Sequence, residues 1–167
     1  MKTTRILALW ALIFACSGEA AAAGPEGKPF GLGISLGEPA GVNGKLWLDN
    51  KSALQFAIGF GYWPYNGFAL FADYQYHAAQ IMGPPRDSFR LLFYMGLGAK
   101  LGFWDRHAND HEYRAVGLGV RVPFGLNFVF LRHPFDLFLE VAPVMAFIAP
   151  DPFWFDLDAA FGFRFYF

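Results

Sequence analysis

The sequence predicts an all-β fold: an eight-stranded antiparallel transmembrane β-barrel of the outer-membrane type, preceded by an N-terminal signal peptide. Apolar residues alternate with polar or small ones along most of the chain, which indicates strands because successive side chains point to opposite faces. The chain is 20% aromatic but only 16% charged, against about 25% charged in soluble domains. Its most regular alternation, residues 154–167, ends in Phe167. A barrel in lipid accounts for all three observations, with the apolar face outward and the polar face toward the lumen.

The first 23 residues are predicted to be a secretory signal peptide. Lys2 and Arg5 form its positive start, residues 6–15 its short apolar segment, and an alanine run its cleavage site before Gly24. The apolar segment is shorter than the ~20 residues that a membrane-spanning helix needs. We therefore expect secretion to the periplasm and a final location in the bacterial outer membrane.

One barrel domain, residues 24–167, is expected after cleavage. The whole chain has 13 basic and 14 acidic residues, and removal of Lys2, Arg5 and Glu19 leaves 11 and 13. This near-neutral balance argues against a nucleic-acid partner, which would favour a basic surface. The single cysteine, Cys16, lies within the signal segment, so no disulfide is expected. Lipidation of Cys16 is the alternative route of processing.

The first half of the chain predicts four strands, over residues 30–37, 40–48, 53–62 and 68–77. The third is the most regular, because every second residue from Leu54 to Tyr62 is large and apolar and the residues between them are Ala, Gln or Gly. Residues 49–51 and 63–67 are rich in turn-forming residues. These two segments are therefore expected to reverse the chain between strands.

The second half predicts four more strands, over residues 90–103, 113–131, 135–147 and 154–167. A loop containing Pro84 and Pro85 precedes them, and the polar run from Asp105 to Glu112 is expected to be a water-exposed loop. Alternation is weakest over residues 141–149. Strands of ~10 residues at about 3.3 Å per residue and a tilt of about 40° cover the apolar band of an outer membrane, roughly 25 Å.

Residues 126–131 decide the number of strands. Pro123 cannot donate a ladder hydrogen bond, and together with Gly125 it predicts a β-bulge inside the sixth strand. The total is eight if residues 126–131 continue that strand beyond the bulge, and nine if they form another. We expect eight, because closed single-chain bacterial barrels have an even number of strands.

Ten charged side chains are expected to face the lumen. They are Lys45, Asp73, Arg90, Lys100, Arg121, Asp136, Glu140, Asp156, Asp158 and Arg164. Eight strands enclose a lumen just wide enough to be filled by side chains, and an unpaired charge in such a space costs several kcal/mol. Five bases and five acids therefore predict a salt-bridged plug. A narrow gated ion path or a small-ligand pocket is the alternative.

No catalytic, metal or cofactor site is predicted. A lipid hydrolase needs a serine near a histidine base, and none of the serines of the mature chain, Ser35, Ser52 and Ser88, lies close to a histidine in the sequence. His107 and His111 have two aspartates nearby, but only a helix would place both on one face for a metal ion. An outer-membrane lipid-modifying enzyme is therefore the third hypothesis for function.

The C-terminal alternation also suggests a role in assembly. Phe163, Phe165 and Phe167 lie on the expected outward face, and an aromatic last residue after alternating apolar residues resembles the signal that the barrel assembly machinery reads. We expect these three residues to serve as the assembly signal as well as lipid-facing surface.

Several segments together resemble an uncharacterised family of small outer-membrane β-barrels of Gram-negative bacteria. They lie at residues 31–34, 37–41, 44–48, 117–126, 135–143 and 162–167. The resemblance implies an eight-stranded barrel similar to the OmpA membrane domain. It transfers no catalytic residue.

The first functional hypothesis is a structural or interaction role in the envelope, for a monomer that contacts outer-membrane lipid and the assembly machinery. A small pore or carrier for a small solute is the alternative. A soluble β-sandwich or a lipocalin-like carrier is the rival fold. A lipocalin reverses the pattern, because its apolar residues line the cup and its polar residues face water.

Overall fold

The computed structural model describes residues 24–61, 67–83, 88–108, 111–148 and 153–167, and it leaves the side chains of 104–108, 111–115, 148 and 154 undescribed. The predicted signal peptide with Cys16 and the loop at Pro84 and Pro85 lie outside the described residues. Among the described residues, no helix is long and apolar enough to cross a membrane.

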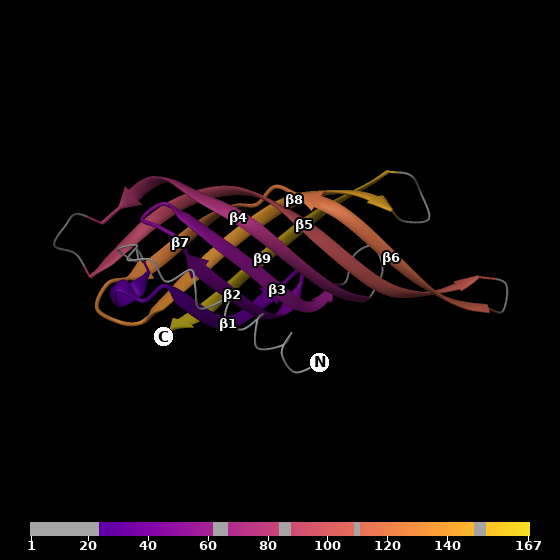
Figure 1. The fold of residues 1–167 in the computed structure, drawn as a ribbon, viewed down its shortest axis with the longest axis horizontal. Coiled ribbons are helices and arrows are strands. Elements are labelled where there is room, and N and C mark those ends of the chain that lie inside the picture. Colours follow the sequence, from indigo (N-terminus) through magenta and orange to yellow (C-terminus); the bar gives the residue numbers. More distant parts are fainter. Residues whose placement is uncertain (1–23, 62–66, 84–87, 109–110, 149–152) are drawn as a thin grey trace, which may run out of the picture.

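A short 3₁₀ helix and nine antiparallel strands make up the described chain (Figure 1). They are η1 (Pro25–Gly27), β1 (Phe30–Gly37), β2 (Ala40–Trp47), β3 (Ser52–Gly61), β4 (Gly67–Met82), β5 (Phe89–Ala108), β6 (His111–Arg121), β7 (Phe124–Phe130), β8 (Phe135–Ile148) and β9 (Trp154–Tyr166).

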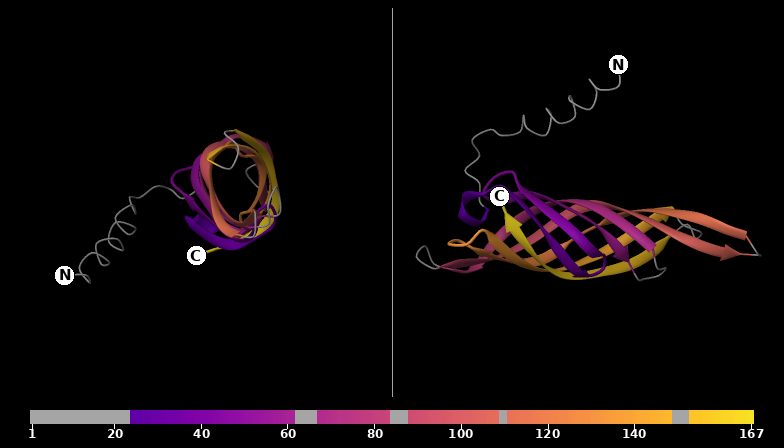
Figure 2. Two further views of the ribbon diagram at one scale, coloured as in Figure 1. Left: turned by 90° about the vertical axis from the view of Figure 1, so that its right-hand side faces the viewer. Right: turned by 90° about the horizontal axis from the view of Figure 1, so that it is seen from below.

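The strands close into a barrel. β4, β3, β2, β1, β9 and β8 are neighbours in that order, β8 pairs with both β6 and β7, both of these pair with β5, and β5 returns to β4. The view along the barrel shows the resulting ring of strands (Figure 2). We call the end where β1 begins and β9 ends the terminal end, and the end where the β5–β6 hairpin projects the hairpin end. The predicted all-β barrel is confirmed.

β6 and β7 are two parts of one strand position. Arg121 and Phe124 lie opposite Gly98 and Met95 on β5, and opposite Val144 and Val141 on β8. The three-residue advance from Arg121 to Phe124 is therefore matched by a three-residue advance on β5 and on β8. The register is the same on both sides of the gap between β6 and β7. The ring has eight strand positions, as expected from the sequence.

The predicted bulge at Pro123 is wrong. No residue is inserted there, because the proline only removes one donor from the ladder. Its own carbonyl still accepts from Gly96 N at 2.8 Å, and Val122 N donates to the carbonyl of Pro143 at 3.0 Å. The register shifts that do occur lie in β4, between His77 and Met82, and at the β6–β8 pairing near Leu118. The sequence pattern did not reveal these positions.

The polar run from Asp105 to Glu112 was expected to be a loop, and this expectation is also wrong. β5 continues to Ala108 and β6 begins at His111, and the backbone stays in register with Asp105 opposite Arg114 and His107 opposite Glu112. A two-stranded extension beyond the barrel has no core to face, so it needs no apolar alternation. The period-two signal therefore disappears although the ladder continues.

The two faces of the wall differ as predicted. Large apolar side chains on the outer face are exposed along the barrel, such as Ile58 at 46%, Phe60 at 64% and Leu97 at 61%, whereas the alternating positions are buried. Residues 141–144 keep this alternation where the sequence pattern was weakest. The outside of the barrel is therefore apolar and the interior is polar.

Candidate functional site: the charged interior

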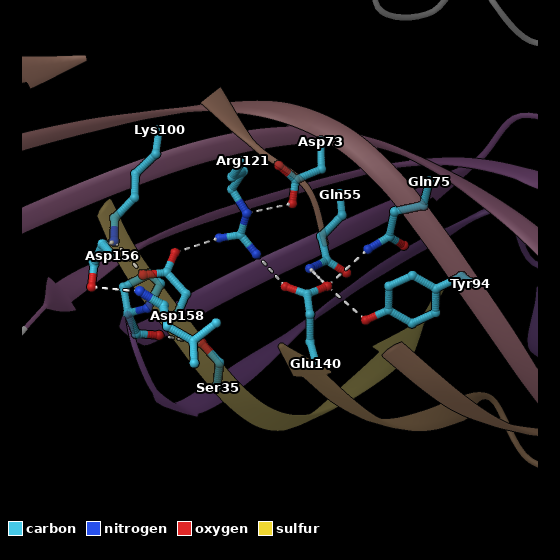
Figure 3. A network of polar contacts seen from close by, with 12 residues as sticks. Ser35, Gln55, Asp73, Gln75, Tyr94, Lys100, Arg121, Glu140, Asp156 and Asp158 are labelled. Carbon is cyan, nitrogen blue, oxygen red and sulfur yellow. Dashed lines mark hydrogen bonds and ion pairs between the residues drawn. The ribbon is translucent and has the colours of Figure 1, made fainter. Parts of the chain in front are cut away.

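Arg121 on β6 is the hub of the interior. Its guanidinium contacts three carboxylates: Nε lies 3.2 Å from Oδ2 of Asp73, Nη1 lies 3.1 Å from Oδ2 of Asp158, and Nη2 contacts Oε1 of Glu140 (Figure 3). The ring of Phe71 lies 3.7 Å from its Cζ. All four polar side chains are buried, so one cation holds together acids from β4, β8 and β9.

Glu140 joins this hub to neutral polar groups. Its Oε2 accepts hydrogen bonds from Nε2 of Gln55 at 3.0 Å, from Nε2 of Gln75 at 3.1 Å and from the hydroxyl of Tyr94 at 2.7 Å. With the bond from Arg121 the carboxylate has four donors. Figure 3 shows these side chains converging from β3, β4, β5 and β8. The hydrogen-bonding capacity of this buried carboxylate is therefore satisfied by side chains.

Lys100 forms the part of the network nearest the hairpin end. Its Nζ lies 3.3 Å from Oδ2 of Asp156 and 2.5 Å from Oδ1 of Asp158. Carboxylate oxygens of Glu38, Asp156 and Asp158 come within 4.8 Å of one another, an arrangement that could hold a metal ion. The ammonium group of Lys100 already contacts two of these three carboxylates, so Lys100 supplies their positive charge.

Arg164 and Asp136 form the part nearest the terminal end. Nε of Arg164 donates to Oδ1 of Asp136 at 2.9 Å, and Nη1 donates to Oε1 of Gln55 at 2.7 Å. Oδ2 of Asp136 accepts from Nδ2 of Asn127 at 2.9 Å and from the hydroxyl of Tyr166 at 2.7 Å. Gln55 therefore links this pair to Glu140, and the network continues along the lumen.

Lys45 departs from the predicted pairing of bases with acids. Among the described residues no carboxylate oxygen lies within salt-bridge distance of its Nζ, which instead contacts Oδ1 of Asn127 at 2.8 Å and Nε2 of His77 at 2.9 Å. The rings of Trp47 and Tyr94 lie 4.5 and 5.1 Å from Nζ. Nδ1 of His77 lies 2.9 Å from the carbonyl of Lys51. A neutral His77 with its proton on Nδ1 satisfies both contacts.

The structure thus brings together eight of the ten predicted interior charges, in pairs or groups that contain all five acids. Lys45 lies in the same lumen with neutral partners, and Arg90 lies half-buried near the terminal end of β5, opposite Val129. Six neutral side chains also belong to the network, although the predicted set contained only charged residues. They are Gln55, Gln75, His77, Tyr94, Asn127 and Tyr166.

An apolar cluster fills the lumen at the terminal end. Trp47, Ala53, Leu92, Val129 and Tyr166 are all buried and pack together. Nε1 of Trp47 donates to the hydroxyl of Tyr166 at 3.3 Å. We call this cluster the floor, because it separates the charged network from the terminal end.

The proposed assembly residues lie on the outer face of β9. Phe163, Phe165 and Phe167 are 40%, 42% and 64% exposed. Phe163 contacts the ring of Phe135 on β8 at 5.6 Å between centroids, and Phe165 contacts Phe167 edge to face at 5.3 Å. The last residue is also fixed by its backbone, because Phe167 N donates to the carbonyl of Phe30 at 2.9 Å.

The serines weighed for a hydrolase and the histidines weighed for a metal site lie in several different places. The hydroxyl of Ser35 contacts the carbonyl of Pro39 at 3.1 Å, and that of Ser52 accepts from Tyr74 at 2.9 Å. His107 and His111 lie on facing strands of the β5–β6 hairpin, where His111 is paired with Ala108. The side chains of both histidines lie outside the described set.

No protein-family model matches the chain, and no curated protein matches its sequence. The fold is similar to that in the crystal structure of the N-terminal β-barrel domain of Pseudomonas aeruginosa OprF, with a TM-score of 0.63 over 84% of this chain and 98% of that chain. The sequence identity is 16%, so the likeness concerns the fold alone. Fold and interior define a closed antiparallel β-barrel with an apolar outer face and a charge-paired lumen.

Proposed function

We propose that the chain is an outer-membrane β-barrel whose interior is occluded and whose role in the envelope is structural or interactive. The observation that supports this best is the inverted distribution of polarity. Side chains of Arg121, Arg164 and Lys45 are at most 1% exposed, whereas large apolar side chains cover the outer face. In water this arrangement would leave an apolar surface far larger than a soluble monomer tolerates.

The long β5–β6 hairpin favours one orientation. Outer-membrane barrels extend further on their external side than on their periplasmic side, so we place the terminal end in the periplasm and the β5–β6 hairpin outside the cell. The exposed phenylalanines near the terminal end, such as Phe165 and Phe167, then lie at the inner headgroup level. Aromatic side chains are enriched at such interfaces.

Cell fractionation tests the location. The full precursor, expressed in a Gram-negative host, should partition with the outer membrane and migrate faster on a gel without heating than after boiling, because the closed barrel resists detergent.

Ile58→Asp and Leu97→Asp place a charge on the outer face and should lower the yield, since a charge at the midplane of a barrel costs about 2–4 kcal/mol for basic residues and less for acidic ones. Asn50→Asp in an exposed turn is the matched control. Release of the unmodified protein into the soluble periplasm would contradict the proposal.

The occluded interior is proposed from the network and the floor together. Side chains from β2 to β9 meet across the lumen through hydrogen bonds, and the floor closes it at the terminal end. Such pairing stabilises buried charges only when every partner is in place. An occluded lumen favours a structural role in the envelope. A small pore is the alternative, and a conductance measurement distinguishes the two.

We also propose that the chain is a monomer, that the barrel assembly machinery is its transient partner, and that its relatives are the small outer-membrane barrels that its sequence resembles. The outward position of Phe163, Phe165 and Phe167 supports the second point, because a signal on the outer face of the last strand is accessible before the barrel closes. No enzymatic role is proposed. The interior groups that could serve as acids or bases, such as Glu140 and Asp158, are already bound by cations.

A further inference from the structure

The first described residues form a compact segment at the terminal end, Gly24–Pro29. Gly27 N donates to the carbonyl of Gly24 and Lys28 N to that of Pro25, both at 3.0 Å, and the carbonyl of Pro29 accepts from Trp47 N at 2.8 Å. Figures 1 and 2 show this indigo segment beside the C-terminus. It is therefore fixed to the barrel rather than extended away from it.

The segment reaches part of the way across the mouth of the barrel. It leads directly into β1, yet η1 lies against β7. In the ring, β9 and β8 stand between β1 and β7, so the contact is made across the opening and not along the wall. The segment thus covers the floor from the terminal end.

Gly24 occupies a place that has no room for a side chain. A Cβ atom there would lie 1.9 Å from the carbonyl oxygen of Lys28 and 3.0 Å from Cδ1 of the indole of Trp47. Its φ of −65° is open to any residue, so the restriction is one of space. Gly24 is buried, and Trp47 below it is 2% exposed.

We propose that the mature N-terminus is created at Gly24 and stays docked beside Trp47 at the terminal end of the barrel. A signal peptidase would hydrolyse the bond between Ala23 and Gly24 with one water molecule, which leaves a carboxylate on Ala23 and an α-amine on Gly24. This amine takes up a proton near neutral pH, because α-amino groups have a pKa of about 7.7–8.0.

The geometry places the nitrogen of Gly24 beside the indole of Trp47. An amide nitrogen lies roughly 2.5 Å from the Cβ position of its own residue, so the nitrogen of Gly24 lies within about 5.5 Å of Cδ1 of Trp47, given the 3.0 Å contact. The inference rests on the predicted cleavage of the signal peptide. It adds that the new N-terminal residue, Gly24, is held beside Trp47.

The experiment measures the sequence and the reactivity of the N-terminus. Protein purified from the outer membrane should begin at Gly24, and its α-amine should react with an acylating reagent at pH 7 at least ~10-fold more slowly when folded than after boiling in detergent, because a docked group reacts only through local opening. A different first residue, or equal rates in both states, would overturn the inference.

Two variants separate docking from general folding. Gly24→Ala keeps a small residue for cleavage but inserts the Cβ atom for which there is no room, and it should raise the labelling rate of the folded protein toward that of the unfolded one. Glu26→Ala, at an exposed position of the same segment, is the matched control and should leave the rate unchanged. Trp47→Leu, compared with Phe60→Leu on the outer face, tests the indole itself. An unchanged rate in both Gly24→Ala and Trp47→Leu would also overturn the inference, whereas protein found only in the soluble fraction would contradict the proposed location instead.

Discussion

At the scale of single residues, Arg121 shows why the interior needs charges of both signs. The guanidinium contacts Asp73, Glu140 and Asp158, and all four side chains are buried. Three carboxylates this close would repel one another strongly without the cation. The stability of the centre therefore depends on one side chain more than on any single apolar contact around it.

Replacement of this hub has a large expected effect. Arg121→Met keeps most of the volume but leaves the buried Asp73 and Glu140 without a cation and Asp158 with Lys100 alone, and it should lower the free energy of unfolding by about 3–5 kcal/mol. Urea unfolding in detergent micelles, followed by tryptophan fluorescence, measures the difference. Lys28→Met removes the exposed pair with Glu26 and should change stability by less than about 1 kcal/mol. Equal effects of the two substitutions would contradict the central role of Arg121.

The last residue gives a second prediction at this scale. Phe167→Asp replaces an exposed aromatic side chain but keeps the backbone bond to the carbonyl of Phe30, so the folded barrel should lose little. If Phe167 belongs to an assembly signal, the yield in the outer membrane should fall several-fold while refolding in detergent stays efficient. Phe60→Asp, equally exposed near the opposite end of the barrel, is the control for the charge alone. Unchanged outer-membrane yield would refute the assembly role.

At the scale of elements, the turn between β2 and β3 is stabilised by one side chain. Oδ1 of Asp49 accepts hydrogen bonds from the backbone N–H groups of Lys51 at 2.7 Å and Ser52 at 2.8 Å. These donors favour the ionised form, and they lower the pKa of Asp49 below its ordinary value. The lowered pKa means that the carboxylate stabilises the folded turn above the unfolded pKa, and that this contribution is lost as the pH falls through the folded pKa.

A pH series tests this turn. Asp49→Ala should destabilise the protein at neutral pH, and the difference from the unmodified protein should shrink once the pH drops below about 3.9, the ordinary pKa of Asp. Asp49→Asn retains an acceptor oxygen and should lie between the two. Unfolding midpoints measured from pH 7 to pH 2.5 give the comparison. A difference that stays constant over this range would show that the charge of Asp49 plays no part.

The sequence predicted elements well where each strand has one face on the apolar outside of the barrel and one in the lumen. β3 follows the predicted alternation at every position, because both neighbours and both environments continue along its whole length. The β5–β6 hairpin beyond Trp104 was missed, since a ladder outside the barrel has no second environment to select apolar residues. Pro123 was misjudged for another reason: a missing donor and an inserted residue look the same in the sequence.

The interior was predictable in composition but not in pairing. The inward direction of Arg121 and Asp158 follows from the period of two alone, yet their contact joins β6 to β9 past the intervening β8. Such partners depend on the shear of the closed barrel, which no local pattern encodes. Lys45 shows the limit most clearly, because Asp136 is already bound by Arg164, Asn127 and Tyr166 and the lysine is left with neutral partners.

At the scale of the whole molecule, the network and the floor together predict an electrically silent barrel. Purified protein in a planar lipid bilayer should give no steady conductance above the baseline, because the lumen is crossed by paired side chains from β2 to β9. An open channel-forming protein in the same bilayer is the positive control. A stable, reproducible conductance that grows with the amount of inserted protein would favour the small pore instead.

The bond between Arg164 and Gln55 has a consequence for how the ring closes. Arg164 lies on β9 and Gln55 on β3, so their contact passes over β1 and β2. β1 and β9 are the two ends of the barrel sequence, and their pairing is the seam that turns a sheet into a cylinder. A slip of one residue at that seam would turn Arg164 out to the apolar outer face. The contact between Arg164 and Gln55 therefore forms in only one register of the β1–β9 pairing. It stabilises the correctly closed barrel from the inside.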